Sequence, residues 1–165
     1  TNKGASSIAE YFDGFGWYIG ATEAASQPIY PDESFILRTP ELGGIQFTIH
    51  GSVLSSDLLY VLHRINSGDK QDIYLSPNVL GSQTFDQIFP PEVARPGDEV
   101  LLFDNSTAGI NKGATEVVEY FDGFGWFRGA TDYNDYAIPA DYGIIYRMGT
   151  AGQDFRVGVS ASPLQ

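Results

Sequence analysis

The stretch EYFDGFGWY at Glu10–Tyr18 returns almost letter for letter as EYFDGFGWF at Glu119–Phe127. In each copy an Asp-Gly pair, at positions 13–14 and 122–123, separates two aromatic runs. Asp and Gly tolerate the positive φ angles of a tight turn, so this pair between aromatic runs is a strong signal for a β-hairpin. Both copies are therefore predicted to be aromatic hairpins.

The similarity extends beyond the two hairpins. When Asn2 is aligned with Asn111, an offset of 109 residues, 19 of 37 positions are identical over 2–38 and 111–147. This period is too long for one turn of a solenoid and indicates a duplicated β unit. The predicted organisation is a first β unit at 1–54, a connecting segment with a possible short helix at 55–96, and a second β unit at 97–165 that ends in an extended strand.

The local patterns predict an all-β fold of antiparallel sandwich-like or barrel-like units with at most one short helix. The one helix candidate is Ser55–Gly68, where Leu58, Leu62 and Ile65 recur at helical spacing, whereas Ser82–Glu99 is predicted to be a loop with one helical turn. The predicted strands outside the hairpins are FILR (35–38), IQFTIHGSV (45–53), DIYL (72–75), EVLLFD (99–104), GIIYR (143–147) and DFRVGVS (154–160).

Composition narrows the class of partner. The 165 residues are 42% hydrophobic and 14% aromatic and carry a formal net charge of −12, so we expect a folded chain whose surface repels nucleic acid and anionic membranes. Cysteine is absent, which excludes disulfides and thiolate sites. No apolar run approaches the roughly 20 residues that a membrane-spanning helix needs, so no membrane span is predicted.

No catalytic motif is visible, and the chain is predicted not to be an enzyme. It has only two histidines and lacks a G-x-S-x-G elbow, a P-loop and a G-x-G-x-x-G run. Asp132, Asn134 and Asp135, with Asp141, offer oxygen ligands for Ca²⁺. The EF-hand pattern is absent and the first copy reads TEAASQ at the matching place, so solvated turn residues are favoured and no cofactor is predicted.

Two features of the sequence suggest that the protein binds or carries carbohydrate. Trp17 and Trp126 are of the type that stacks on sugar rings, although alternation along the hairpins turns at least half of their aromatic residues into a core. The single N-x-[ST] sequon places a candidate glycosylation site at Asn105. Glycans are therefore possible partners, and a secreted carbohydrate-binding module is the alternative function.

Laying one copy over the other reveals a missing strand. In the second copy the segment GDEVLLFDNSTAG (97–109) precedes Asn111, and no counterpart precedes Asn2. A sheet that lacks a strand exposes unpaired backbone and apolar side chains. The chain also ends in an alternating segment with Phe155, Val157 and Val159 on one face.

These two features together predict head-to-tail strand complementation between copies. The subunit interface is predicted to pair Phe155, Val157 and Val159 with Ile8 and Tyr11. An interface of this kind that does not close into a ring produces a filament. Two alternatives remain open at this point: the first unit closes on itself, or preceding residues have been removed.

The run from PGDEVLLFDN to GIIYR (96–147) resembles an uncharacterised group of secreted bacterial β-repeat proteins. Their units have a strand ending LLLFDN, a Y-F-G-W hairpin, a Gly-Thr-Asp turn and a P…G-[FI]-I-x-R strand. The resemblance implies secretion and a role at the cell surface, and it supplies no catalytic residues. Together with the missing strand, it leads us to expect a structural subunit of an extracellular bacterial fibril or surface appendage.

Overall fold

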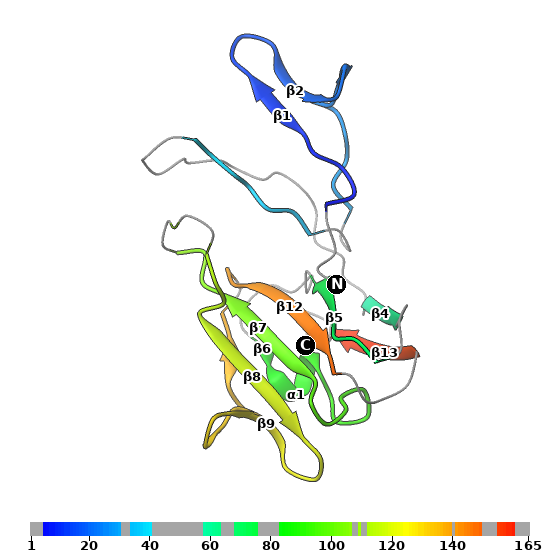
Figure 1. The fold of residues 1–165 in the computed structure, drawn as a ribbon, viewed down its shortest axis with the longest axis vertical. Coiled ribbons are helices and arrows are strands. Elements are labelled where there is room, and N and C mark those ends of the chain that lie inside the picture. The colour runs from blue at the N-terminus through cyan, green and yellow to red at the C-terminus, as the bar shows by residue number, and fades with distance from the viewer. Residues whose placement is uncertain are drawn as a thin grey trace.

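The computed structural model describes residues 5–30, 34–40, 58–63, 68–75, 83–106, 109, 112–139, 141–149 and 155–160. Its main body is one six-stranded antiparallel sheet (Figure 1). In spatial order the strands are β10 (Thr131–Asp132), β9 (Gly125–Arg128), β8 (Glu116–Phe121), β7 (Glu99–Phe103), β12 (Gly143–Met148) and β5 (Gln71–Leu75).

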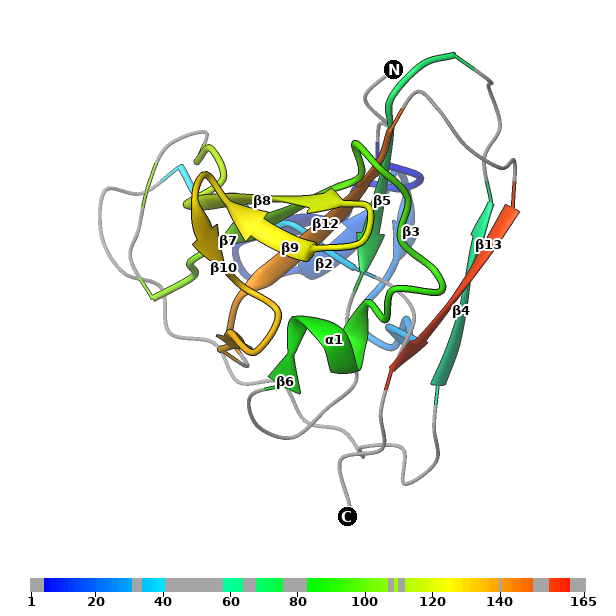
Figure 2. The same cartoon turned by 90° about the horizontal axis from the view of Figure 1, so that it is seen from below.

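One face of this sheet forms the hydrophobic core. Along β7, Val100 and Leu102 are fully buried on this face, and Leu101, which is 8% exposed, lies on the other face with the charged end residue Glu99. The inward face is covered by the short helix α1 (Phe85–Ile88) and by the pair of β6 (Gln83–Thr84) with β11 (Ala137–Ile138), as Figure 2 shows. The all-β antiparallel fold with one short helix is thus confirmed.

Helix α1 lies inside the segment predicted to be a loop with one helical turn. The backbone N–H of Thr84 donates to Oε1 of Gln87 at 3.0 Å, which satisfies one of the free donors at the helix start. Phe85, Ile88 and Phe89 point into the core and are buried. The main role of this four-residue helix is therefore to pack apolar side chains against the sheet.

The first hairpin has the local structure of its counterpart in the sheet. It comprises β1 (Glu10–Phe12), β2 (Gly16–Ile19) and β3 (Thr22–Glu23) and forms a three-stranded sheet of its own. Glu10 pairs with Tyr18 as Glu119 pairs with Phe127. The turn glycines also agree, with φ of 75° at Gly14 and 74° at Gly123. Figure 1 shows this hairpin at the top, apart from the six-stranded sheet.

A second small sheet pairs β4 (Leu58–His63) with β13 (Phe155–Ser160). The helix predicted at Ser55–Gly68 is therefore wrong, because its central residues form β4. The physical reason is a long-range one: β13 satisfies the backbone of β4, and Leu62 is buried in the core. Leucines at helical spacing do not exclude an extended strand when such a partner is available.

Most of the other predicted strands are present as β5, β7, β12 and β13. FILR (35–38) is described but is not a strand, and IQFTIHGSV (45–53) lies outside the described residues. The division at 54 and 96 stays a prediction. In the part of the chain that the structure describes, no helix is long and apolar enough to cross a membrane.

Candidate functional site

Strand β7 joins the second hairpin to the rest of the sheet. It pairs with β8 on one side and with β12 on the other, so Val100 lies between Val118 and Tyr146. Beneath it, the Nε1–H of Trp126 donates to the carbonyl oxygen of Phe89 at 3.0 Å. The hairpin is thus held both through its backbone and through its aromatic core.

The matching residues of the first hairpin lack this cover. Tyr11 is 59% exposed where Tyr120 is 5% exposed, and Trp17 is 39% exposed where Trp126 is fully buried. The contrast continues along the segment 34–38, which corresponds to β12. Phe35 is 52% and Leu37 is 41% exposed, against 4% for Ile144 and 0% for Tyr146.

The contrast does not come from the hairpin's own packing. The Tyr11 and Trp17 rings meet edge to face at 5.4 Å, and the Tyr120 and Trp126 rings do so at 5.3 Å. Two neighbours differ. Trp126 packs against Phe85 and Phe89, which cover the second hairpin from below, and β7 lies beside β8, whereas no strand of the described structure lies beside β1 in the matching place. Among the described residues, the segment 34–38 likewise pairs with no strand.

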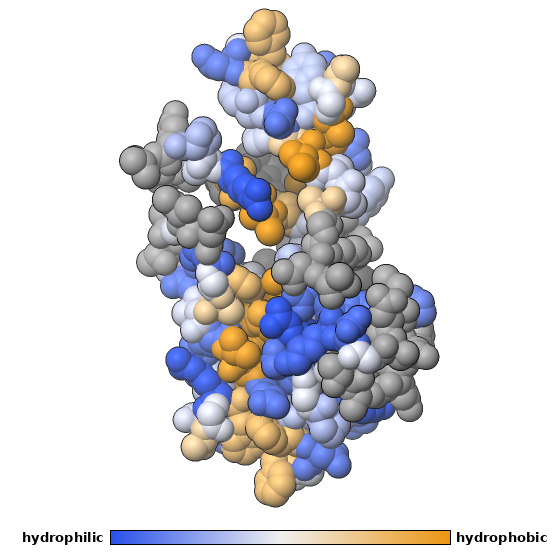
Figure 3. Space-filling view, viewed as in Figure 1, coloured by the Kyte–Doolittle hydropathy of each residue, from blue (hydrophilic) through white to orange (hydrophobic). Residues whose placement is uncertain are grey.

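The exposed apolar surface of this region is large. Soluble monomers rarely expose such surface unless it serves an interaction. Figure 3 shows apolar surface in orange in the upper half of the view, around and below the first hairpin. We call residues 7–10 and 34–38 the acceptor. The exposed large apolar residues of the first 40 positions are Ile8, Tyr11, Phe12, Phe15, Trp17, Ile29, Tyr30, Phe35, Ile36 and Leu37.

The predicted interface residues fall into two separate sets. Ile8 and Tyr11 are exposed on the first hairpin. Phe155, Val157 and Val159 lie on β13, opposite residues 63, 61 and 59 of β4. The structure therefore does not bring the two sets together within one chain.

A buried acid that the sequence analysis missed fixes the start of β7. Asp98 is fully buried, and its Oδ1 accepts from the backbone N–H of Gly149 at 2.7 Å. Its Oδ2 accepts from the backbone N–H of Arg95 at 2.9 Å and from the hydroxyl of Tyr146. The available sequence signal was Pro96-Gly97-Asp98, which is typical of a tight turn. In the structure Gly97 has the positive φ of 81° that such a turn needs.

A row of charges on the outward face of the sheet was also missed. Arg147 binds Asp72 through Nε at 2.6 Å and approaches Glu99 at 3.5 Å, and Glu99 also pairs with Lys70. Hydrogen bonding to Asp72 raises the pKa of Arg147. These residues come from β5, β7 and β12 and the turn before β5, so sequence spacing gives no signal for their meeting.

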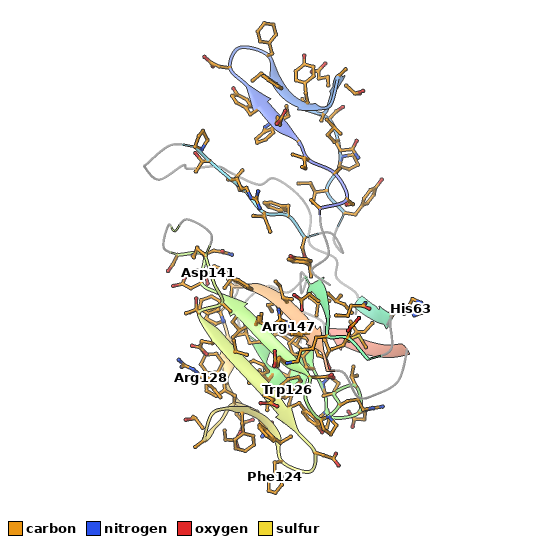
Figure 4. The ribbon with its side chains drawn as sticks, viewed as in Figure 1. His63, Phe124, Trp126, Arg128, Asp141 and Arg147 are labelled. Carbon is orange, nitrogen blue, oxygen red and sulfur yellow. The ribbon has the colours of Figure 1, made fainter. Side chains whose placement is uncertain are left out.

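The two tryptophans have different environments. Figure 4 shows Trp126 inside the main body and Phe124 at the tip of its hairpin, projecting outward. Because Trp126 is fully buried and its Nε1–H is bonded, it cannot stack on a sugar. Trp17 remains accessible beside Tyr11.

Two of the candidate Ca²⁺ ligands, Asp132 and Asn134, have structural partners. Oδ1 of Asn134 accepts from the backbone N–H of Trp126 at 2.7 Å, and Oδ1 of Asp132 accepts from the backbone N–H of Asn134 at 2.8 Å. Partial desolvation, with the charges of Asp135, Asp132 and Glu92, raises the pKa of the exposed Asp86. Within the described residues, no three His, Cys, Asp or Glu side chains are placed to bind a metal.

Asn105 lies on the exposed loop after β7. Its Nδ2 donates to the carbonyl oxygen of Asp141 at 3.0 Å. Next to it, hydrogen bonds from Ser106 lower the pKa of Asp104. Glycosylation at this sequon stays a prediction.

No family model, no curated protein and no solved structure matches this chain. The resemblance to secreted β-repeat proteins therefore stays a prediction, and the candidate site stands on the geometry alone.

Proposed function

We propose that this chain is a structural subunit of an extracellular bacterial fibril or surface appendage, and that it polymerises head to tail by β-strand complementation. One observation carries the proposal. The Tyr and Trp of the aromatic hairpin are buried in the copy that has β7 beside it, and exposed in the copy beside which the described structure has no such strand. A strand from a second copy in the acceptor would give the first hairpin the sheet neighbour that β7 gives the second.

The donor strand in this proposal is β13. In the described structure it belongs to a sheet of two strands, which is supported on the core side through Leu62 of β4. Its sequence alternates apolar residues at 155, 157 and 159, the pattern that a strand needs to cover an apolar face. When β13 leaves β4 and enters a neighbour's acceptor, it loses its backbone hydrogen bonds to one strand. In the acceptor it would pair with residues 7–10 on one side and with residues 34–38 on the other.

The association between subunits is expected to be of moderate strength. Burying a large apolar side chain contributes about 1.5–3 kcal/mol, so covering four of them contributes roughly 6–12 kcal/mol. Association itself costs about 4–15 kcal/mol. The two ranges overlap, and assembly should therefore depend on protein concentration and show a critical concentration.

The proposed contact is heterologous, because the donor and acceptor are different surfaces of the same chain. After two subunits bind, the pair as a whole keeps one free donor at one end and one free acceptor at the other. Repetition gives an open filament when the rotation does not close a ring. The proposed extracellular location rests on the resemblance to secreted β-repeat proteins.

The experiment is negative-stain microscopy and sedimentation of the full chain over a concentration series. Filaments are expected, and removal of residues 155–165 is expected to abolish them. Removal of residues 161–165 alone, which leaves β13 intact, is the matched control and should preserve them. A monodisperse monomer at all concentrations would contradict the proposal.

A secreted carbohydrate-binding module is the second candidate, favoured by the accessible pair of Trp17 and Tyr11. Glycan-array binding that is lost in Trp17→Ala and kept in Trp126→Phe would support it. The two candidates compete for one surface, so sugar binding should be stronger in the monomer than in an assembled chain if both hold.

A further inference from the structure

We propose that the acceptor selects a strand in which an acidic residue is followed by a bulky apolar residue and, two positions later, by a smaller apolar one. Asp154-Phe155-Arg156-Val157 of a second copy is this strand. The inference rests on the proposed strand complementation and specifies its register. The second unit serves as the template, because there a strand already occupies the equivalent place.

The register follows from β7. In the second unit Val100 lies between Val118 and Tyr146, and Leu102 lies between Glu116 and Ile144. The offset of 109 residues converts these flanks into acceptor positions. The residue in the place of Val100 then meets positions 9 and 37, and the residue in the place of Leu102 meets positions 7 and 35.

Side-chain volume selects the bulky residue. Ala9 and Leu37 are smaller than Val118 and Tyr146, so a valine between them would leave a void. Phe155 is larger than valine and would fill this space. A register shifted by two residues would place Val157 there instead and is the poorer match.

The second apolar position is consistent with this register. Phe35 stands in the place of Ile144 and is the larger of the two. Val157, in the place of Leu102, is correspondingly smaller than the residue it replaces. The smaller Val157 on the donor therefore offsets the larger Phe35 on the acceptor.

Charge fixes the residue before Phe155. In the second unit Glu99 lies between Glu119 and Arg147 and approaches Arg147 at 3.5 Å. The matching acceptor residues are Glu10 and Arg38, and both are exposed. Asp154 would take the place of Glu99, so the acid beside an arginine would be reproduced across the junction.

The same register gives Arg156 a suitable place. It would replace Leu101 on the outward face, directly beside Ile8 and Ile36. The aliphatic part of an arginine side chain covers such residues while its charged end stays in water. Glu10 is then a diagonal neighbour, within reach of the guanidinium group. In the register shifted by two residues, Arg156 would instead take the place of Glu99, between Glu10 and Arg38.

Reversing the charge of Arg38 distinguishes the two registers. In the proposed register Arg38→Glu leaves Asp154 between two acids, so the critical concentration is expected to rise about fivefold. The double variant Arg38→Glu/Asp154→Arg places a base between those acids and should restore assembly. In the shifted register Arg38→Glu would place Arg156 between two acids, and the critical concentration would fall. Sedimentation of the full-length chains measures the direction.

Two synthetic peptides test the volume argument by competition with full-length chains. A peptide of residues 153–160 is expected to shorten filaments at concentrations about fivefold lower than the same peptide with Phe155→Val. Equal potency of the two peptides would show that the acceptor does not select a bulky residue at this position.

The control is Arg128→Glu, an exposed charge reversal in the second hairpin, which should leave assembly unchanged. Filaments that are indifferent to Arg38→Glu, or favoured by it, would overturn the inferred specificity while leaving strand complementation intact. If the chain does not assemble at all and binds neither peptide, both the proposed function and the inferred specificity would be overturned.

Discussion

At the scale of single residues, the two tryptophans provide a matched comparison within one chain. Trp126 is fully buried and bonded to the carbonyl of Phe89, whereas Trp17 in the same motif is partly exposed. Trp126→Ala is expected to lower the free energy of unfolding by about 3–5 kcal/mol. Trp17→Ala should cost less than about 1 kcal/mol in the monomer. Urea unfolding at a concentration below assembly measures both.

The same pair distinguishes the monomer from the assembly. If a neighbour's strand covers the first hairpin, Trp17→Ala should raise the critical concentration although it barely changes the stability of the monomer. Equal losses of stability for the two variants in the monomer would show that the first hairpin is already covered, and would contradict the acceptor.

Asp86 yields a prediction about pH. Asp86 is exposed, but partial desolvation, and then the charges of Asp135, Asp132 and Glu92, raise its pKa above the ordinary value of 3.8. The folded state therefore binds this proton more tightly than the unfolded state, and stability falls as pH rises from 3.8 through the raised pKa. Asp86→Asn should be more stable than the natural chain at a pH of about 7.

Unfolding measured as a function of pH checks this. The gain from Asp86→Asn should disappear below pH 3.8, where the carboxyl group is neutral in both states. Asp141→Asn, which changes an exposed acid outside this group, is the control. A gain that persists unchanged at low pH would mean that charge is not its cause.

At the scale of elements, Asp98 ties the start of β7 to the end of β12. It accepts hydrogen bonds from Gly149, Arg95 and Tyr146 in a fully buried position. Each buried donor left without a partner costs about 1–3 kcal/mol, so Asp98→Ala should destabilise by about 3 kcal/mol or more. Thermal unfolding measures the loss, and a change below about 0.5 kcal/mol would exclude the anchoring role.

The elements whose signals are local could be predicted from the sequence. The Asp-Gly turns, with Gly123 at a φ of 74°, define the hairpin without help from distant residues. The apolar run in EVLLFD likewise predicted β7. The duplicated motif then indicated which residues of the first copy match the residues that flank β7, and these became the candidate site.

Elements decided by distant partners were predicted poorly. Leu58–His63 has leucines at helical spacing but forms β4, because it pairs with β13 far along the chain. FILR has strand-forming residues but pairs with no strand among the described residues. The apolar cover supplied by Phe85 and Phe89 was hidden in a loop rich in proline and polar residues.

At the scale of the whole molecule, net charge should govern assembly. Each subunit carries a formal charge of −12, so neighbours in a filament repel one another. The screening length falls from about 30 Å at 0.01 M salt to about 8 Å at 0.15 M. Added salt should therefore lower the critical concentration, as measured by sedimentation, even though it weakens local ion pairs. A critical concentration that rises with salt would contradict an assembly held mainly by apolar contacts.

The most direct test of strand exchange is a covalent one, since the chain has no cysteine of its own. In the proposed register Val157 lies directly opposite Ser7 of a neighbour, at a separation that a disulfide can bridge. Within one chain it lies opposite Val61. Oxidised Ser7→Cys/Val157→Cys is expected to give a ladder of covalent multimers on a non-reducing gel. Two results together would contradict strand exchange. The variant Ser7→Cys/Val157→Cys would give a single monomer band, and under the same assembly conditions Val61→Cys/Val157→Cys would readily form its disulfide within one chain.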